Sequence, residues 1–268
     1  MTRPLFLLTD FGLSDIYVGV MKAVIWRLAP GVPLFDLTHG IPPQDLMTAA
    51  VALEDAWPYL PMDAVICAVV DPGVGTARRA IAVEVGGRFL VGPDNGLFGP
   101  FPAQLGATAE LDPNRLLPGL RLSATFHGRD LFAPASAILA RGGGLAEIGH
   151  DAPRPWQPSP IPTSETDDEG AVVLTVVSRD RFGNCAFNLR RSDLPEEPSG
   201  PRAAEVRLDL PEAPVRGLAE TFADAAPGDP VLYFNSAGRL ELAVRNGSAA
   251  ERFGLAVGDR ARLFLGNP

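Results

Sequence analysis

The sequence predicts two domains, an α/β N-terminal domain with a mostly parallel central sheet and a smaller all-β, barrel-like C-terminal domain. Three observations lead to this prediction. Over residues 1–150, short apolar runs alternate with segments of helical periodicity, a pattern typical of strands joined by crossover helices. A proline-rich stretch follows at residues 151–165. Residues 166–268 then show short apolar runs between turn residues and no long helical pattern, which favours a small barrel.

The N-terminal elements are predicted from apolar runs and from the residues that end them. Residues 64–70 are apolar throughout and stop at Asp71, as expected of a buried parallel strand. Apolar side chains recur at helical spacing over residues 15–28, and Pro30-Gly31 ends that pattern. By the same reasoning we expect strands at residues 5–8, 34–37, 64–70, 81–85 and 88–91, the last two as a hairpin, and helices at residues 15–28, 45–57 and 130–140.

The stretch between the predicted domains has prolines at positions 153, 155, 158, 160 and 162. Proline cannot continue a helix or donate within a central strand, so residues 151–165 are predicted to be a stiff, extended linker. In the C-terminal domain we expect strands at residues 171–177, 204–208, 231–234, 240–244 and 260–265.

Composition limits the functions that the chain can have. Its 268 residues carry a formal net charge of −9, which argues against a general nucleic-acid binder because phosphate neutralisation requires clustered Lys and Arg. No apolar run approaches the roughly 18 residues of a membrane span and no signal peptide is visible, so we expect a cytoplasmic protein without a membrane partner. Cys67 and Cys185 lie in apolar runs outside any CxxC or Cys/His cluster, so we interpret them as buried apolar side chains.

Acidic residues follow or end three successive strands of the predicted sheet. Asp10 follows the first strand, Asp36 lies at the second and Asp71 follows the third, with Asp15 and His39 in the adjoining turns. Ligands of an open parallel sheet bind beyond the carboxyl ends of its strands, where these side chains are expected to meet. Each acid alone is equally compatible with an ordinary cap or turn, but three strands in succession favour a binding site.

The same turns indicate the kind of ligand. Neither GxGxxG after the first strand nor GxxxxGK[ST] anywhere occurs, so no dinucleotide or triphosphate cradle is predicted. Carboxylates repel phosphates, but they accept hydrogen bonds from ribose hydroxyls and from ammonium groups. The predicted site therefore suits an uncharged or cationic nucleoside.

Three further polar motifs are candidates for this site. His127 lies just before a predicted helix and beside an arginine and an aspartate, where it can orient and activate water, although a lone histidine is also a common structural hydrogen-bonding group. Residues 180–184 offer an acid, an aromatic ring and an amide that can pair with a purine edge. Residues 235–238 precede a predicted strand, and like residues 180–184 they are also compatible with a plain β-turn.

Taken together, these segments resemble the S-adenosylmethionine (SAM) hydrolases, also called SAM hydroxide adenosyltransferases, a family related to the fluorinases and chlorinases. The matching motifs run in order through nearly the whole chain, so their agreement is specific although each motif alone is weak. They are residues 9–12 with Asp15, 17–22, 69–76, 91–96, 125–130 with 132–134, 180–184 with Asn188, and 235–236 with Gly238 and Glu241.

The resemblance implies that the protein cleaves SAM into adenosine and methionine, with water attacking the ribose C5′ carbon. It implies that Asp71, Arg78 and His127 are catalytic, and that Arg78 holds a hydroxide-like oxygen by charge while the other two orient it. It implies no metal and no cofactor, because SAM itself is the substrate. The substrate-binding residues that it implies are Asp10 for ribose, Asp15, Asp180 for the methionine ammonium, Phe182 and Asn184 for adenine, Ser236 for the methionine carboxylate, and Glu241 and Val244 nearby.

The resemblance also implies a homotrimer in which the N-terminal domain of one subunit and the C-terminal domain of a neighbour share each site. Three other functions remain open. A SAM-dependent halogenase is disfavoured, because fluorinases and chlorinases lack the Asp/Arg/His combination and a halide needs desolvation rather than deprotonation. A catalytically inert nucleoside-binding protein would bind SAM without releasing adenosine. A metal-dependent phosphohydrolase would use as ligands Asp10, Asp36, His39, Asp71 and His127.

Overall fold

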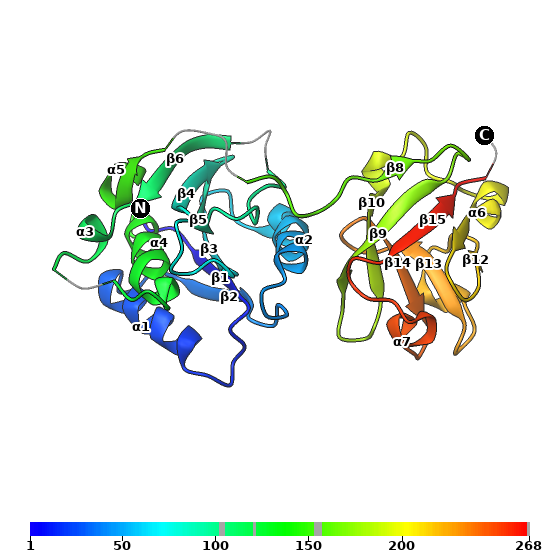
Figure 1. Ribbon diagram of the computed structural model, residues 1–268, viewed down its shortest axis with the longest axis horizontal. Helices are drawn as coiled ribbons and strands as arrows, with labels where there is room; N and C mark the ends of the chain where they lie inside the picture. Colours follow the sequence, from blue (N-terminus) through cyan, green and yellow to red (C-terminus); the bar gives the residue numbers. More distant parts are fainter. Residues whose placement is uncertain (102–104, 120–121, 153–156, 267–268) are drawn as a thin grey trace. The chain divides into compact units, whose positions relative to one another are not determined.

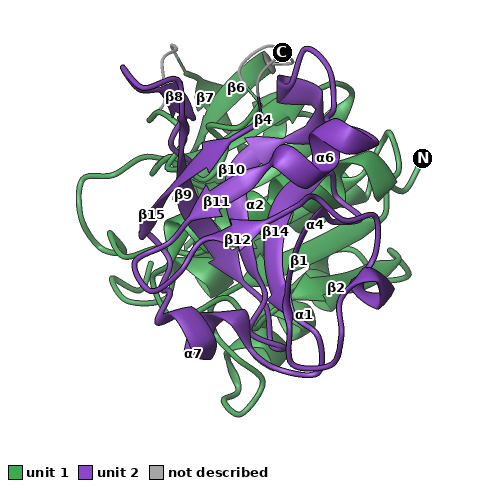
Figure 2. Ribbon diagram, turned by 90° about the vertical axis from the view of Figure 1, so that its right-hand side faces the viewer, with its two compact units in different colours: residues 1–160 green, residues 161–268 purple. Residues whose placement is uncertain are grey.

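The computed structural model describes residues 1–101, 105–119, 122–152 and 157–266, and it divides the chain into two compact units, Met1–Pro160 and Ile161–Pro268 (Figures 1 and 2). Each unit has its own apolar core. Within the described ranges, no helix is long and apolar enough to span a bilayer.

The first unit is a mixed α/β domain around a seven-stranded sheet of order β2-β1-β3-β5-β4-β6-β7. β1 pairs in parallel with both β2 and β3, and β3 pairs in parallel with β5, so the predicted parallel core is confirmed. Antiparallel pairs attach β4, β6 and β7. The strands are β1 (Leu5–Thr9), β2 (Leu34–Thr38), β3 (Val65–Val69), β4 (Ala80–Val85), β5 (Arg88–Pro93), β6 (Leu105–Leu111) and β7 (Gly149–Asp151).

Helices cover both faces of this sheet. α1 (Tyr17–Leu28) and α4 (Ala133–Ala140) pack against each other on one face, and α2 (Leu46–Ala56) lies across the sheet from them (Figure 1). Side chains of β1 alternate between the two faces, and Leu5 and Leu7 enter the same core as Met21 and Ile25 of α1. Two short helices, α3 (Pro113–Leu116) and α5 (Leu145–Ile148), complete the unit.

The second unit is an antiparallel, nearly closed β-barrel of strand order β12-β11-β15-β9-β10-β14-β13, with β8 paired to β9. The Ala219 N–H donates to the Leu232 carbonyl at 2.8 Å, which links the chain after β12 to β13 and almost closes the barrel. The strands are β8 (Glu165–Thr166), β9 (Val172–Arg179), β10 (Cys185–Arg190), β11 (Arg207–Asp209), β12 (Val215–Arg216), β13 (Pro230–Phe234), β14 (Arg239–Val244) and β15 (Arg260–Phe264), and the helices are α6 (Pro201–Glu205) and α7 (Ala249–Phe253).

Several local predictions differ from the structure. The strand predicted at residues 204–208 is wrong at its start, because Pro201 opens helix α6 and the strand begins only at Arg207. Strands β6 and β7 were not predicted, since their short runs of small and polar residues give a weak pattern. β7 includes Asp151 and β8 begins at Glu165, so both ends of the predicted linker pair with strands, while prolines 153 and 155 lie outside the described residues.

Both cysteines are free and buried, as predicted from their apolar surroundings. Burial raises the pKa of the Cys67 thiol to about 12 and that of Cys185 to about 11. A thiol in such surroundings stays protonated at neutral pH and acts as a small apolar side chain.

Candidate active site

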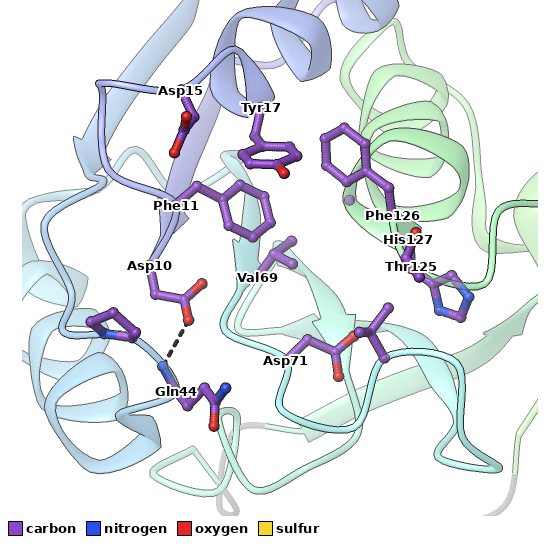
Figure 3. Close-up of a pocket in the computed structure, with 13 residues that line it drawn as sticks. Asp10, Phe11, Asp15, Tyr17, Gln44, Val69, Asp71, Thr125, Phe126 and His127 are labelled. Atoms are coloured by element: carbon purple, nitrogen blue, oxygen red, sulfur yellow. Dashed lines mark hydrogen bonds between the residues drawn. The ribbon is translucent and has the colours of Figure 1, made fainter.

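A cavity of about 420 Å³ opens at the carboxyl ends of β1 and β3. It brings together four of the predicted site residues, Asp10, Asp15, Asp71 and His127, from three separate segments of the first unit. This convergence follows from the parallel sheet, whose strand ends meet at one edge. The described lining consists of Asp10, Phe11, Asp15, Tyr17, Pro43, Gln44, Val69, Asp71, Val74, Thr125, Phe126, His127 and Gly128 (Figure 3).

Asp10 follows β1 directly, and the turn before α2 holds its carboxylate. The Oδ2 of Asp10 accepts a hydrogen bond from the backbone N–H of Gln44 at 2.8 Å (Figure 3). The preceding residue, Thr9, contacts His39 Nδ1 through its hydroxyl at 2.7 Å, and the Gly12 N–H donates to the His39 carbonyl at 2.9 Å. Within the described part of the chain Oδ1 of Asp10 has no hydrogen-bond partner, so it is available to a ligand hydroxyl.

Asp71 and Arg78 form a buried ion pair that also engages His127. The Arg78 Nε donates to Asp71 Oδ1 at 2.9 Å and to Oδ2 at 3.1 Å, and a terminal nitrogen of Arg78 bonds Oδ2 as well. The same terminal nitrogen donates to Nδ1 of His127 at 2.7 Å. The side chains of Arg78 and Asp71 are only 10% and 6% exposed. Arg78 is absent from the described cavity lining, so it acts from behind Asp71 and His127.

The contact with Arg78 determines the protonation of His127. A guanidinium can only donate, so Nδ1 of His127 accepts this bond and the proton of the neutral ring is on Nε2. Burial and the positive charge of Arg78 lower the pKa of His127 below its ordinary value of 6.5, against the opposing charges of Asp71 and Asp130. His127 is therefore neutral at pH 7, and its Nε2–H is a hydrogen-bond donor.

Gly75 allows the two segments of this cluster to approach each other. Its φ is +77°, and a Cβ atom there would lie 2.5 Å from the carbonyl oxygen of Ala124, in the segment that leads to His127. His127 itself precedes a π-helical turn, Gly128–Phe132, that runs into α4. Such wide turns are frequent at functional sites because they redirect a side chain within a helix.

Three aromatic rings that the sequence analysis did not single out line the upper part of the cavity in Figure 3. Phe126 lies edge-on to Tyr17 at 5.1 Å and to Phe11 at 6.0 Å between ring centroids. A Cβ on Gly128 would come within 3.1 Å of the Phe126 ring, so a larger residue there would push this ring aside by a few tenths of an ångström. Phe11 follows β1 and Tyr17 begins α1, whereas Phe126 comes from a distant segment, and no local pattern in the sequence predicts that they meet.

In the second unit, the Asp180 side chain organises the turn at residues 180–184. Its Oδ1 accepts hydrogen bonds from the N–H groups of Phe182 and Asn184, both at 2.9 Å, and its Oδ2 accepts one from Asn184 Nδ2 at 2.9 Å. Both carboxylate oxygens of Asp180 thus accept hydrogen bonds from the turn itself. The ammonium group of a ligand would have to bond their remaining lone pairs. The ring of Phe182 is left 69% exposed.

A hollow of about 550 Å³ lies beside this turn and contains Phe182, Asn184 and Val244, three of the predicted residues. Phe222 also lines it and was missed by the sequence analysis, since it lies in a short 3₁₀ turn without a recognisable motif. Its ring is 44% exposed and packs on Tyr233 at 4.7 Å. Two exposed rings at one hollow are suited to stacking with a planar base. Arg245, Asn246 and Gly247 complete the described lining.

Ser236 and Glu241 occupy different environments. Ser236 is exposed in the turn between β13 and β14, whereas Glu241 is only 9% exposed. Glu241 accepts hydrogen bonds from the Tyr233 hydroxyl and from Asn235 Nδ2, the latter at 2.7 Å. Asn235 in turn accepts two backbone N–H groups of the turn through its Oδ1. Glu241 therefore holds the turn that presents Ser236. Burial of the Tyr233 hydroxyl and its hydrogen bond to Glu241 raise the pKa of Tyr233.

Asp36 and His39 belong to a separate cluster beside β2. His39 Nε2 lies 3.0 Å from Asp36 Oδ1, and Lys22 donates to Asp36 Oδ2 at 2.7 Å. Neither Asp36 nor His39 belongs to the described cavity lining. Among the residues that the structure describes, no group of three or more His, Cys, Asp or Glu side chains is placed to hold a metal ion. The metal-dependent phosphohydrolase has no donor set in this part of the chain.

Comparisons of this chain with protein families, with individual proteins and with solved structures agree with one another. The model of the SAM hydroxide adenosyltransferase N-terminal domain matches residues 5–149, and that of the C-terminal domain matches residues 174–262. The (R)-S-adenosyl-L-methionine hydrolase of Thermus thermophilus is 45% identical over 98% of this chain and its own whole length. A fluorinase from an Actinoplanes species is 28% identical, with 94% of each chain covered. A crystal structure of an uncharacterized conserved protein from Thermotoga maritima superposes with a TM-score of 0.86 at 30% identity, covering 97% of this chain and 99% of that one.

Proposed function

The chain belongs to the SAM hydroxide adenosyltransferase family, and on this premise we propose that it hydrolyses S-adenosyl-L-methionine to adenosine and L-methionine. The observation that carries the proposal is the Asp71–Arg78–His127 cluster, which places an acid and a neutral histidine on the wall of a cavity whose other side presents Asp10. The relatives named (R)-SAM hydrolase support both the substrate and the reaction.

The reaction is a direct displacement at carbon. The water oxygen forms a bond to C5′ while the C5′–S bond breaks and its electron pair moves to sulfur. Methionine leaves as a neutral thioether, so no acid has to protonate the leaving group. One proton of the water passes to the acceptor of its O–H bond and from there to solvent. The task of the protein is to hold one water in line with the C5′–S bond, and such positioning supplies a large part of the rate.

The cluster is suited to holding that water. Asp71 Oδ1 accepts one bond from Arg78, so a further lone pair remains for an O–H of the water. The Nε2–H of His127 can donate to the same oxygen. Arg78 is engaged by both side chains and lies behind them, so we assign it the orientation of Asp71 and His127 rather than direct contact with a hydroxide.

The binding roles follow from the groups left available. We assign ribose to Asp10, whose Oδ1 is unpaired among the described residues, and substrate contact to Asp15, which lines the same cavity. We assign the methionine end to Asp180 and Ser236. The exposed rings of Phe182 and Phe222 would stack on adenine, and Asn184 would bond its edge. Glu241 acts indirectly, through the turn at Asn235.

The configuration at sulfur is the finer part of this proposal. Because relatives that are 45% identical are named for the (R) epimer, we propose that this protein also prefers (R)-SAM. Assays on the resolved epimers, with adenosine measured by chromatography, should show faster release from the (R) form. Equal rates from both epimers would contradict this preference.

Product analysis tests the reaction directly. Incubation with SAM in halide-free and in halide-rich buffer should give adenosine and methionine in both, because the cluster provides for deprotonation of water. A 5′-halo-5′-deoxyadenosine product would instead support the halogenase alternative. The same assay with EDTA tests the metal-dependent alternative, which activity after chelation excludes. SAM binding without adenosine release would identify a catalytically inert binding protein.

We further propose that the active form is the homotrimer that the family resemblance implies. Two separate sets of groups support this, since the cavity near Asp71 offers partners for ribose and water, whereas the hollow near Asn184 offers partners for adenine. Light scattering should give three times the 28.4 kDa chain mass. At a SAM concentration too low to saturate Asn184→Ala, mixing this weakly binding variant with the inactive Asp71→Asn variant should give more activity than the two variants measured separately. A monomer, or a mixture without this gain, would contradict a site shared between subunits.

A further inference from the structure

Gln44 has a backbone conformation that its side chain does not favour. Its φ is +66°, and the only other described residue besides glycine with a positive φ is Asn246. Left-handed backbone is unfavourable for a residue such as glutamine, and it persists only where the surroundings enforce it. Here Pro43 precedes Gln44, and Asp45 follows as the N-cap of α2, accepting the Thr48 N–H at 2.9 Å.

This conformation has two effects at the cavity. It turns the N–H of Gln44 onto Oδ2 of Asp10 at 2.8 Å, which leaves Oδ1 for the ligand. It also directs the Gln44 side chain into the cavity, where Figure 3 shows it extending from beneath Asp10 toward Asp71. No hydrogen bond ends on the Gln44 side-chain amide within the ranges that the structure describes.

The hydrogen bonds of an attacking water show why such a group is needed. A water has two O–H groups and two lone pairs, and one lone pair must face C5′ during attack. The other lone pair can accept Nε2–H of His127, and one O–H can bond Oδ1 of Asp71. The other acceptor sites of Asp71 and His127 are already used, because Arg78 bonds both oxygens of Asp71 and Nδ1 of His127. The second O–H of the water therefore needs another acceptor.

We propose that Gln44 is a further catalytic residue, whose side-chain carbonyl accepts the second O–H of the attacking water. This inference rests on the proposed hydrolysis and adds one group to its site. The four bonds of the water then point to Asp71, His127, Gln44 and C5′, so its attacking lone pair is held in line. The neutral amide suits this place because both O–H groups become more acidic as the O–C5′ bond forms, whereas a second carboxylate beside Asp71 would repel it.

Two substitutions separate the side chain of Gln44 from its backbone. Gln44→Gly keeps the positive φ and the N–H that binds Asp10 but removes the amide. Gln44→Met keeps an unbranched chain of similar length, again without the amide. For both we expect kcat to fall about tenfold, the worth of one neutral hydrogen bond made in the transition state, with KM for SAM within twofold of the wild type. Gln44→Asn, which tolerates the left-handed region and keeps a shorter amide, should retain more activity than either.

The controls distinguish this inference from the proposed function. Wild-type protein in the same assay must release adenosine, and if it does not, the proposed hydrolysis fails. If the wild type is active while Gln44→Gly and Gln44→Met keep kcat within twofold, the amide does not act on the water and this inference alone is wrong. A rise in KM at constant kcat would likewise overturn it, because it would place the amide on the ribose. Thermal unfolding of each variant shows that the fold is retained.

Discussion

The two units hold their candidate site residues in different ways. In the first unit Asp71 and Arg78 are buried, and Arg78 reaches His127 across 49 positions of sequence. In the second unit Asp180 is exposed and bonds only its own turn, two to four residues away. A buried, paired charge is costly to place but fixed in orientation, as reaction chemistry requires. An exposed ring on a self-contained turn is better suited to recognition.

Replacing Arg78 tests the rigid side of this comparison and should have the largest effect. Arg78→Met removes the group that orients Asp71 and His127, so we expect kcat to fall about 10²- to 10³-fold, as for the loss of one preorganised donor. The variant should also lose stability, by about 3–5 kcal/mol, because Asp71 is left buried without a partner. The double variant Asp71→Asn/Arg78→Met should recover stability but not activity. Steady-state kinetics and denaturant unfolding measure both effects.

Gly75→Ala tests whether the cluster depends on close approach of the two segments. The new Cβ would meet the Ala124 carbonyl oxygen at 2.5 Å, so the loop must move away from the segment that carries His127. We expect kcat to fall about tenfold to a hundredfold, since small displacements of catalytic groups have effects of this order. Gly170→Ala is the matched control, because Gly170 has φ +79° with nothing within 4 Å of the added Cβ. Equal activity of the two variants would show that the approach is unimportant.

Phe182→Ala tests the recognition side, and its effect should fall on binding. Loss of one stacked base contact is worth about 1–3 kcal/mol, so we expect KM for SAM to rise about tenfold or more while kcat changes little. Phe222→Ala should act in the same direction if both rings face one base. A fall in kcat at unchanged KM would break the division between chemistry in one unit and recognition in the other.

The pH dependence gives the smallest and most specific test. The pKa of His127 is lowered, so the ring is neutral at pH 7 and becomes protonated only as the pH falls below 6.5. Protonation of Nδ1 removes the acceptor of the Arg78 bond, so kcat should be constant near pH 7 and decline at a pH below 6.5. Histidine NMR titration should give the same lowered pKa, and Arg78→Met should raise it, since the positive charge is removed. A wild-type pKa above 6.5 would contradict the lowering by burial and by the charge of Arg78.

The sequence alone was sufficient for the fold class and for part of the site. Strand and helix periods are local properties, so the parallel core and the barrel could be predicted from them. Asp10 and Asp71 could be placed in one cavity because the ends of parallel strands meet at one edge. The strand expected at residues 204–208 failed for a local reason as well, since a proline-initiated helical turn was read as part of a strand.

The tertiary structure alone decided which partners each polar group has. Arg78 lies behind Asp71 and His127, His127 carries its proton on Nε2, and Glu241 bonds Asn235 and Tyr233. The cavity also gained Gln44, whose role depends on a positive φ that no residue preference predicts. These features depend on contacts between segments far apart in the chain, and hydrogen-bond geometry is set only when such segments pack. The sequence determined that Asp10, Asp71 and His127 reach one site, and packing determined which further groups join them and which of their atoms are left free to act.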